Sequence, residues 1–252
     1  MQAIECLSFK SYNMKVEQIF NLSNHSKLVS RPFFSIIITT YNRANILKKA
    51  INSLILQTEP DWEAIIIDDE SSDDTYLQVL PYIRKDSRIR YIRKAHSGEA
   101  MSKNSGINSS AGRFVSFLDS DDEYSPVHLQ SRKSILLHNP SVCFLYGGVK
   151  IIGNQYVPDR FDSKKKIHLS ECVIGGTFFI ERNTLIQLNG FKKIILGTDA
   201  DLFERAVQAG VIMKETEIPS YIYHHETEDS ITNMLIKSTL EPDVMFSEIS
   251  PQ

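Results

Sequence analysis

Cysteine, long apolar stretches and a strong net charge are all lacking in this chain of 252 residues. Its three cysteines, Cys6, Cys143 and Cys172, are odd in number and far apart. They match neither a disulfide framework nor a zinc-binding spacing, and they are typical of a reducing compartment. No stretch approaches the roughly 18 apolar residues of a membrane span, and the N-terminus lacks a basic region followed by a long apolar run. We therefore expect a soluble, cytoplasmic protein.

The balance of charges argues against a nucleic-acid partner. With 28 basic and 31 acidic residues the formal charge is −3, so no overall field attracts nucleic acid or anionic lipid. Local contact with a membrane surface stays open. The 42% of hydrophobic residues suffice for a core, and a single α/β domain of this length is ordinary.

The first half of the chain alternates strand and helix patterns. FFSIIITT (33–40) and EAIIIDD (63–69) are continuous apolar runs rich in β-branched residues, which is typical of strands buried on both faces of a parallel sheet. Further strands are predicted at 88–93 and 113–119, and helices at 46–55, 76–80 and 98–112. This rhythm predicts an α/β fold with a doubly wound, mostly parallel sheet.

The second half is less regular. Helices are predicted at 126–138 and 199–210, the latter ending at a glycine C-cap, and strands at 142–148 and 175–182. The stretch 150–170 matches no template. Capping side chains are available ahead of the first two helices of the chain: Asn42 or Asn45, and Ser71, Ser72 or Asp73.

Polar clusters follow three of the predicted strands, at the point where each strand ends. TTYNR (39–43), the pair at 68–69 and DSDD (119–122) are distant in sequence, but open α/β sheets bind ligands in one crevice at the carboxyl ends of their strands. Asp119 and Asp121, two residues apart in an extended segment, point the same way and suit a divalent cation that also binds substrate phosphates. A solvated turn or a helix cap is the alternative interpretation of this acidic run.

Four motifs follow one another along the chain: TTYNR, IIIDDESSDDT, GEAMSKNSGI ahead of FVSFLDSDD, and GTDADLFERA. In this order and at these separations they resemble glycosyltransferase family 2 over residues 33–232. The resemblance implies a GT-A fold with a nucleotide-binding half (33–122) and an acceptor half (123–232), flanked by an N-terminal extension (1–32) and a C-terminal tail (233–252). It also implies a nucleotide-sugar donor, Mn²⁺ or Mg²⁺ on the DxD motif, and inversion at the anomeric carbon.

The same resemblance assigns the donor ligands. Thr40, Tyr41 and Arg43 become candidates for packing against uracil and ribose. Either Asp68 or Asp69 becomes the acceptor of a hydrogen bond from the base, for which a carboxylate is the charge-assisted choice. The remaining donor-binding candidates are Gly98, Lys103, Asn104 and Asp119.

A metal shell is implied around the DxD motif. Asp121 resembles the direct ligand, and Asp119 the residue between the ribose and the metal. The pair His224 and His225 resembles a late histidine-containing loop of the family. Adjacent residues of an extended segment face opposite ways, so at most one reaches the metal, and His225 is our candidate. Lys103 stands where the family often has arginine. Lysine keeps the positive charge but lacks the planar guanidinium that binds a phosphate through two hydrogen bonds.

The catalytic base of the family is usually the Asp of a Glu-Asp pair that opens a late helix. GTDADLFER places Thr198 and Asp199 at that pair, so Asp199 is the predicted base and the Glu is absent. A typical general base contributes about 10²- to 10⁴-fold to the rate. The alternative is that Asp199 only caps a helix. Asp201, two residues on, is expected on a different face of the helix.

The predicted activity is transfer of a sugar, from a UDP-sugar as the first expectation, to a glycan or lipid-linked acceptor in surface polysaccharide or glycoconjugate synthesis. Residues 150–176, the segment that corresponds to the acceptor surface of the family, contain no pattern that identifies the acceptor. The lysines at 164–166 either meet a lipid-linked diphosphate, as a peripheral contact at the inner face of the membrane, or belong to a solvated loop. Two other classes stay open: a nucleotidyltransferase, which the lack of glycine in TTYNRAN disfavours, and a non-catalytic nucleotide-sugar binding protein, which the missing Glu slightly favours.

Overall fold

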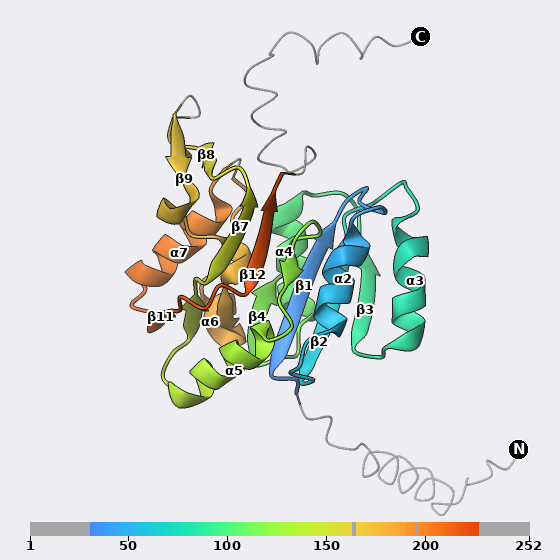
Figure 1. The fold of residues 1–252 in the computed structure, drawn as a ribbon, viewed down its shortest axis with the longest axis horizontal. Helices are drawn as coiled ribbons and strands as arrows, with labels where there is room; N and C mark the ends of the chain where they lie inside the picture. The colour runs from blue at the N-terminus through green and yellow to red at the C-terminus, as the bar shows by residue number, and fades with distance from the viewer. Residues whose placement is uncertain (1–30, 163–164, 195, 227–252) are drawn as a thin grey trace, which may run out of the picture. The chain divides into compact units, whose positions relative to one another are not determined.

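The structure is a computed structural model and describes residues 31–162, 165–194 and 196–226 (Figure 1). Most of the predicted N-terminal extension, the C-terminal tail and Lys164 lie outside these residues. None of the helices described is long and apolar enough to cross a membrane.

The strands predicted in the first half form one side of a seven-stranded sheet. They are all mutually parallel: β1 (Phe34–Thr40), β2 (Trp62–Asp68), β3 (Ile89–Arg93) and β4 (Phe114–Phe117). The strand order is β11-β6-β10-β4-β1-β2-β3, and it is completed by β6 (Phe144–Tyr146), β10 (Phe179–Glu181) and β11 (Met213–Glu215). Only β10 runs against the others in this sheet. The predicted doubly wound, mostly parallel sheet is therefore confirmed.

Helices cover both faces of this sheet (Figure 1). One face carries α2 (Leu47–Ile55), α3 (Thr75–Lys85) and α5 (His128–His138), and the other carries α4 (Glu99–Ser109), α6 (Arg182–Gln187) and α7 (Thr198–Gln208). Within β1, Ile36 and Ile38 belong to the first core and Ile37 to the second. Successive side chains of a strand point to opposite faces, so a strand between two helical layers must be apolar throughout.

Short strands account for the stretch that matched no template. A three-stranded sheet has the order β5 (Glu123–Tyr124), β12 (Tyr221–His225), β7 (Val149–Gly153), and a separate hairpin pairs β8 (Tyr156–Pro158) with β9 (Lys166–His168). Two single turns of 3₁₀-helix, η1 (Leu169–Glu171) and η2 (Gly175–Thr177), precede β10. Strands of two to five residues are too short to show a clear alternation. The β12 strand lies beside the end of the acidic run through its pairing with β5.

The predicted caps of the first two helices are wrong in detail. The residue before α2 is Ile46, and no side chain caps that helix. Asn42 instead adopts a positive φ of 51° and accepts a hydrogen bond from the Ser72 N–H at 2.8 Å, so it joins the loops after β1 and β2. Asp73 accepts from the Thr75 N–H at 3.0 Å, although Asp74 is the residue that precedes α3. The C-terminal glycine of the late helix is confirmed, because Gly210 follows α7 with a φ of 67°.

A buried arginine on α5 holds the loops that lead into the smaller sheet. Arg132 is fully buried, and its Nη2 donates to the carbonyl oxygens of Gly147 and Ile218 at 3.0 and 3.2 Å. Burial lowers the pKa of Arg132 to about 10. Gly147 directly precedes the turn into β7, and Ile218 lies ahead of β12. The guanidinium therefore fixes two strands of the second half against α5.

We expect Arg132→Met to lower the free energy of unfolding by about 2–4 kcal/mol, because it leaves the carbonyl oxygens of Gly147 and Ile218 without their charged donor. Denaturant unfolding followed by circular dichroism measures the change. Ser134→Met, at an exposed position of the same helix, is the matched control and should stay within about 0.5 kcal/mol of wild type. Equal unfolding midpoints for the two variants would contradict this role of Arg132.

Candidate active site

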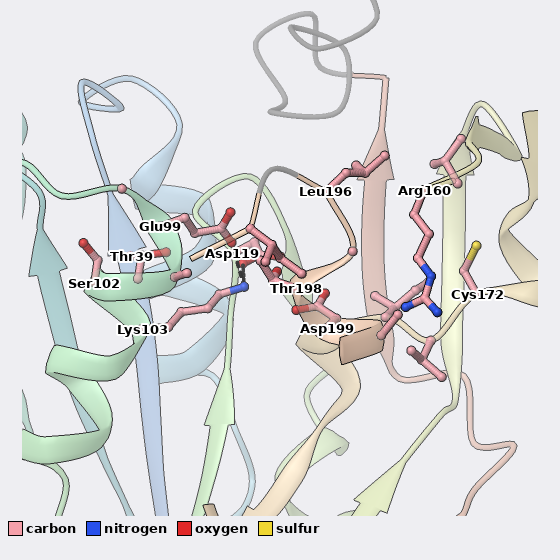
Figure 2. A pocket seen from close by; sticks show the side chains of 18 of the residues that line it. Thr39, Glu99, Ser102, Lys103, Asp119, Arg160, Cys172, Leu196, Thr198 and Asp199 are labelled. Carbon is pink, nitrogen blue, oxygen red and sulfur yellow. Dashed lines mark ion pairs between the residues drawn. The ribbon is translucent and has the colours of Figure 1, made fainter. Parts of the chain in front are cut away.

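A cavity of about 930 Å³ lies at the carboxyl ends of β1, β2 and β4 (Figure 2). From the first half it is lined by residues that follow these strands, including Thr40, Asp69, Asp119 and Asp121. From the second half it is lined by the β8–β9 hairpin, the segment before η2 and the start of α7. The three polar clusters predicted from the sequence do converge, since a parallel sheet brings the ends of its strands together.

Asp69 is the member of the aspartate pair that faces the cavity. Its carboxylate accepts from Lys94 Nζ at 2.7 Å and from the backbone N–H of Gly98 at 2.8 Å. Burial alone would raise the pKa of Asp69, but these two donors outweigh it and lower the pKa. Asp68 is turned away from the cavity, where it accepts from the Ser71 N–H at 2.8 Å. Asp69 is therefore ionised and lines the cavity from a buried position, whereas Asp68 closes the loop behind it.

Aromatic and hydroxyl groups lie next to Asp69. Tyr41 is 47% exposed, and its ring centroid lies 4.6 Å from that of His96. The His96 Nδ1 is 3.0 Å from the Asp69 carboxylate. The Thr40 hydroxyl is buried at the rim and has no hydrogen-bond partner among the described residues. His96 was not among the residues predicted from the sequence. Its position two residues before Gly98, ahead of α4, could have indicated that it lies near the site.

The acidic segment after β4 is balanced by two cations. Arg43 Nη1 lies 3.4 Å from Asp121 Oδ2. Lys103 is buried, and its Nζ lies 2.6 Å from Glu99 Oε1 and 3.6 Å from Asp119 Oδ1 (Figure 2). Enclosure in the protein raises the pKa of Asp119 to about 7; Lys103 opposes this shift, and the negative charges of Glu99 and Asp121 add to it.

Asp122 is a structural residue, and not the solvated turn that its sequence context allowed. It is fully buried, and its carboxylate accepts from the Tyr221 hydroxyl at 2.6 Å and from the His224 N–H at 2.7 Å. Burial, together with the nearby Asp119 and Asp121, raises the pKa of Asp122. Through these bonds β12 fixes the segment that carries the DxD motif.

The carboxylates of the site suit a divalent cation that is shared with a substrate. They do not form a complete set of protein ligands around an ion. Among the described residues no group of three or more His, Cys, Asp or Glu side chains is placed to hold an ion. Two carboxylates, Asp119 and Asp121, line the cavity, and burial, with a smaller contribution from nearby negative charges, raises the pKa of the first. A hard cation accepts two carboxylates when substrate phosphates and water complete its coordination.

The two histidines of β12 face opposite ways, as predicted, but the one that lines the cavity is His224 and not our candidate His225. His224 lines the cavity, and its Nε2 lies 2.9 Å from Glu123 Oε1 and 2.8 Å from Lys49 Nζ. His225 lies outside the lining, and its Nδ1 contacts the Asn154 carbonyl oxygen at 2.8 Å. Strand register decides which residue faces the site, and β12 was not predicted as a strand.

Asp199 lies at the start of α7 and faces the same cavity from the other side (Figure 2). Its Oδ2 accepts from the Gly175 N–H at 3.0 Å, and its buried Oδ1 has no hydrogen-bond partner within the part of the chain described. Burial raises the pKa of Asp199; Lys103 opposes this shift, and the negative charge of Glu99 adds to it. The residue at the N-cap of α7 is Gly197, so capping does not account for Asp199. One oxygen of Asp199 is therefore anchored, and the other is left for a substrate.

Two more predicted residues have contacts of their own. Asn104 lies outside the cavity lining, and its amide pairs with the Phe191 backbone through two hydrogen bonds of 2.8 Å. This contact explains Asn104 without any ligand. Asp201 pairs with Arg205 at 2.7 Å and Lys192 at 3.1 Å, on a different face of α7 from Asp199, as expected.

Known proteins resemble this chain in sequence and in fold. The profile of "Glycosyl transferase family 2" matches residues 35–195. The Escherichia coli UDP-Glc:alpha-D-GlcNAc-diphosphoundecaprenol beta-1,3-glucosyltransferase WfgD is 34% identical over 158 residues, which cover 61% of this chain and 61% of the relative. The Campylobacter jejuni GalNAc(5)-diNAcBac-PP-undecaprenol beta-1,3-glucosyltransferase is 31% identical over 185 residues, 68% of this chain and 59% of the relative. The chain thus matches about three fifths of the length of these two relatives.

Solved structures agree on the fold. Staphylococcus aureus TarS 1-349 in complex with UDP-GlcNAc has a TM-score of 0.67 at 17% identity, covering 86% of this chain and 68% of TarS. The Pyrobaculum calidifontis mannosyltransferase PcManGT, in complex with GDP-Man and Mn²⁺, has a TM-score of 0.61 at 16% identity, covering 84% of this chain and 64% of PcManGT. The GT-A fold is confirmed, and the chain belongs to glycosyltransferase family 2.

Proposed function

We propose that this protein is an inverting glycosyltransferase that moves a sugar from a UDP-sugar to a hydroxyl of a lipid-linked glycan. The observation that carries the proposal is the Asp199 carboxylate, which shares one cavity with Asp69 and with the pair Asp119 and Asp121. A base, a nucleotide pocket and a diphosphate site on opposite walls of one cavity are what direct displacement needs.

The donor end of the cavity suits a uridine diphosphate. Asp69 is an ionised acceptor for the imide N–H of uracil, Tyr41 offers an exposed ring for stacking, and the Thr40 hydroxyl is available to the ribose. Asp119 and Asp121 would hold Mn²⁺ or Mg²⁺ against the diphosphate. When bound, the ion offsets the charge that develops on the leaving group. A solved neighbour contains Mn²⁺, which supports a divalent ion.

The acceptor hydroxyl meets Asp199 on the other side of the donor sugar. Asp199 Oδ1 takes the proton while the hydroxyl oxygen bonds to the anomeric carbon, and the bond from that carbon to the diphosphate oxygen breaks with its electron pair on UDP. Attack opposite the leaving group inverts the anomeric carbon. Burial raises the pKa of Asp199 and so makes it a stronger base than an exposed aspartate, while the Gly175 N–H fixes its orientation.

The acceptor class rests on the relatives and on the lining of the second half. The names of the two bacterial relatives describe transfer to sugars on diphosphoundecaprenol. The wall of the cavity beyond Asp199 is largely apolar, with Val157, Ile167, Leu169, Val173, Leu196 and Phe203. A lipid-linked glycan fits this wall, and such an acceptor places the protein peripherally at the inner face of a membrane.

The remaining classes are separated by one assay, metal-dependent release of nucleoside diphosphate from a panel of donors. The panel contains UDP-glucose, UDP-galactose, their N-acetyl forms and GDP-mannose. Neither the comparisons nor the loop after β1 favours a nucleotidyltransferase. A non-catalytic binding protein would bind a donor without releasing nucleoside diphosphate, whatever acceptor is added.

Asp121→Ala should abolish transfer and weaken Mn²⁺-dependent UDP binding while leaving the melting temperature close to wild type, because a carboxylate shared with the ion and the diphosphate is lost. Calorimetry of UDP binding with and without Mn²⁺ measures the effect. Asp74→Ala, an exposed aspartate outside the cavity, is the control. Wild-type transfer that persists undiminished in EDTA would rule out the ion.

Wild-type protein should bind UDP more tightly than CDP by about 1.5–3 kcal/mol, the contribution of a hydrogen bond to a charged group. Asp69→Asn should narrow this gap, and Asp68→Asn should preserve it. Because UDP and CDP are compared within each variant, a general loss of nucleotide affinity caused by a looser loop cancels out of the difference. Equal affinities of the wild type for UDP and CDP would overturn the assignment of Asp69, and a preference for GDP would change the donor class.

Asp199→Asn should reduce transfer by at least about 100-fold and change the dissociation constant of the donor by less than about threefold, because only proton transfer in the transition state is lost. Transfer kinetics, donor binding and a melting curve are measured on the same preparation. Asp201→Asn is the matched control. We expect near-normal transfer from this variant, because Asp201 is engaged in surface ion pairs with Lys192 and Arg205. If Asp199→Asn transfers sugar at the wild-type rate, Asp199 is not the base.

A further inference from the structure

The acceptor end of the cavity contains a cation that the proposed chemistry of transfer does not use. Arg160, in the loop after β8, points into the space opposite Asp199 (Figure 2). Its side chain is 26% exposed, although an arginine head usually lies in water. Lys193 is the other cation of this wall, and it is exposed.

The stem of Arg160 is held beside the start of α7. A Cβ atom added to Gly197 would lie 3.0 Å from Arg160 Cδ, so the arginine packs directly on that glycine. Gly197 precedes the proposed base by two residues, a span of at most about 7 Å. The Arg160 stem therefore packs against the turn of chain that leads directly into the proposed base.

The charged partner of Arg160 is a weakly held one. Arg160 Nη2 pairs with Glu204 Oε1 from α7, and the Glu204 side chain is 51% exposed. A pair this exposed to water contributes little stability. Of the other acids on this wall, Asp159 is engaged with the backbone N–H groups of Phe161 and Asp162 at 2.7 and 3.1 Å. Glu171 also lines this wall, but within the part of the chain described the ion pair that an incoming anion has to break at the guanidinium is the one with Glu204.

We propose that Arg160 binds the diphosphate of a lipid-linked acceptor, and that this diphosphate displaces Glu204. The inference rests on the proposed function and specifies how its acceptor is selected. A guanidinium binds phosphate oxygens through two parallel hydrogen bonds, and a diphosphate carries more negative charge than the single half-exposed carboxylate of Glu204. The apolar wall between β8 and α7 receives the first part of the lipid.

The test compares two acceptors that share a sugar. GlcNAc-diphosphofarnesol carries the diphosphate, and octyl α-GlcNAc does not; UDP-glucose is the donor. For each variant the measured quantity is the ratio of kcat/KM for the first acceptor to kcat/KM for the second. Arg160→Gln should lower this ratio by about 10- to 100-fold, the range for loss of a charge-assisted hydrogen bond. Arg160→Lys should lower it less, because the charge remains without the fork.

Glu204→Gln separates binding from a structural role. If Arg160 holds the diphosphate, removing the competing carboxylate should raise the ratio, by up to about fivefold. If the ion pair only fixes the β8–β9 hairpin on α7, both substitutions break the same pair and shift both acceptors alike. Arg113→Gln is the control. It removes a similar surface pair with Glu181 at the end of β4 that lies away from the cavity, and it should leave the ratio unchanged. Equal ratios for wild type and Arg160→Gln, or a lowered ratio in Glu204→Gln, would overturn the proposal.

A binding measurement keeps this inference distinct from the proposed function. Calorimetry follows the binding of farnesyl diphosphate to protein already saturated with UDP and Mn²⁺. Affinity should fall by about 10-fold or more in Arg160→Gln and should not fall in Glu204→Gln. If wild type transfers sugar to neither acceptor, the proposed function fails, and the farnesyl diphosphate titration still decides whether Arg160 binds a diphosphate. Unchanged affinity in Arg160→Gln would then count against Arg160.

Discussion

The buried ammonium of Lys103 is the interaction on which the rest of the site depends. Its side chain is 4% exposed and lies between Glu99 and Asp119, at 2.6 and 3.6 Å. Burial would lower the pKa of Lys103, but Asp119, Glu99 and Asp199 together raise it well above its usual value. A buried charge is tolerated only where partners of opposite sign surround it. Lys103 therefore joins α4, the end of β4 and the start of α7 around one charge.

This arrangement leaves more acidic than basic side chains in the lining of the cavity. Asp69, Glu99, Asp119, Asp121 and Asp199 line it, and Lys103 and Arg43 are the cations beside the DxD motif. Burial, together with its acidic neighbours, raises the pKa of Asp119 to about 7 even with Lys103 beside it. Asp122, held by two hydrogen bonds from β12, fixes the segment that carries these carboxylates. Under the proposed function, a divalent cation bound together with the donor diphosphate would offset this negative charge.

The sequence allowed prediction of the parallel part of the sheet and of the convergence of polar clusters at its edge. Both follow from local signals: strands buried between two layers of helices must be apolar throughout, and parallel strands end on one side. Orientation could not be predicted in the same way. Asp68 faces away from the cavity, Asn104 holds Phe191, and His224 lines the cavity in place of His225. These outcomes depend on the register of short strands and on contacts with distant segments, which no local pattern records.

The missing Glu of the Glu-Asp pair is compatible with the proposed role of Asp199 as base, because another contact orients its carboxylate. Thr198 stands at the Glu position and lines the cavity, whereas the Gly175 N–H bonds Asp199 Oδ2 at 3.0 Å. A Cβ atom on Gly175 would lie 2.4 Å from Asp199 Cγ, so only glycine permits this approach of backbone to carboxylate. Acceptor orientation, which a neighbouring Glu would otherwise assist, must then come from elsewhere on the acceptor wall. Arg160, packed on Gly197 at the start of the same helix, is the polar group best placed to supply it.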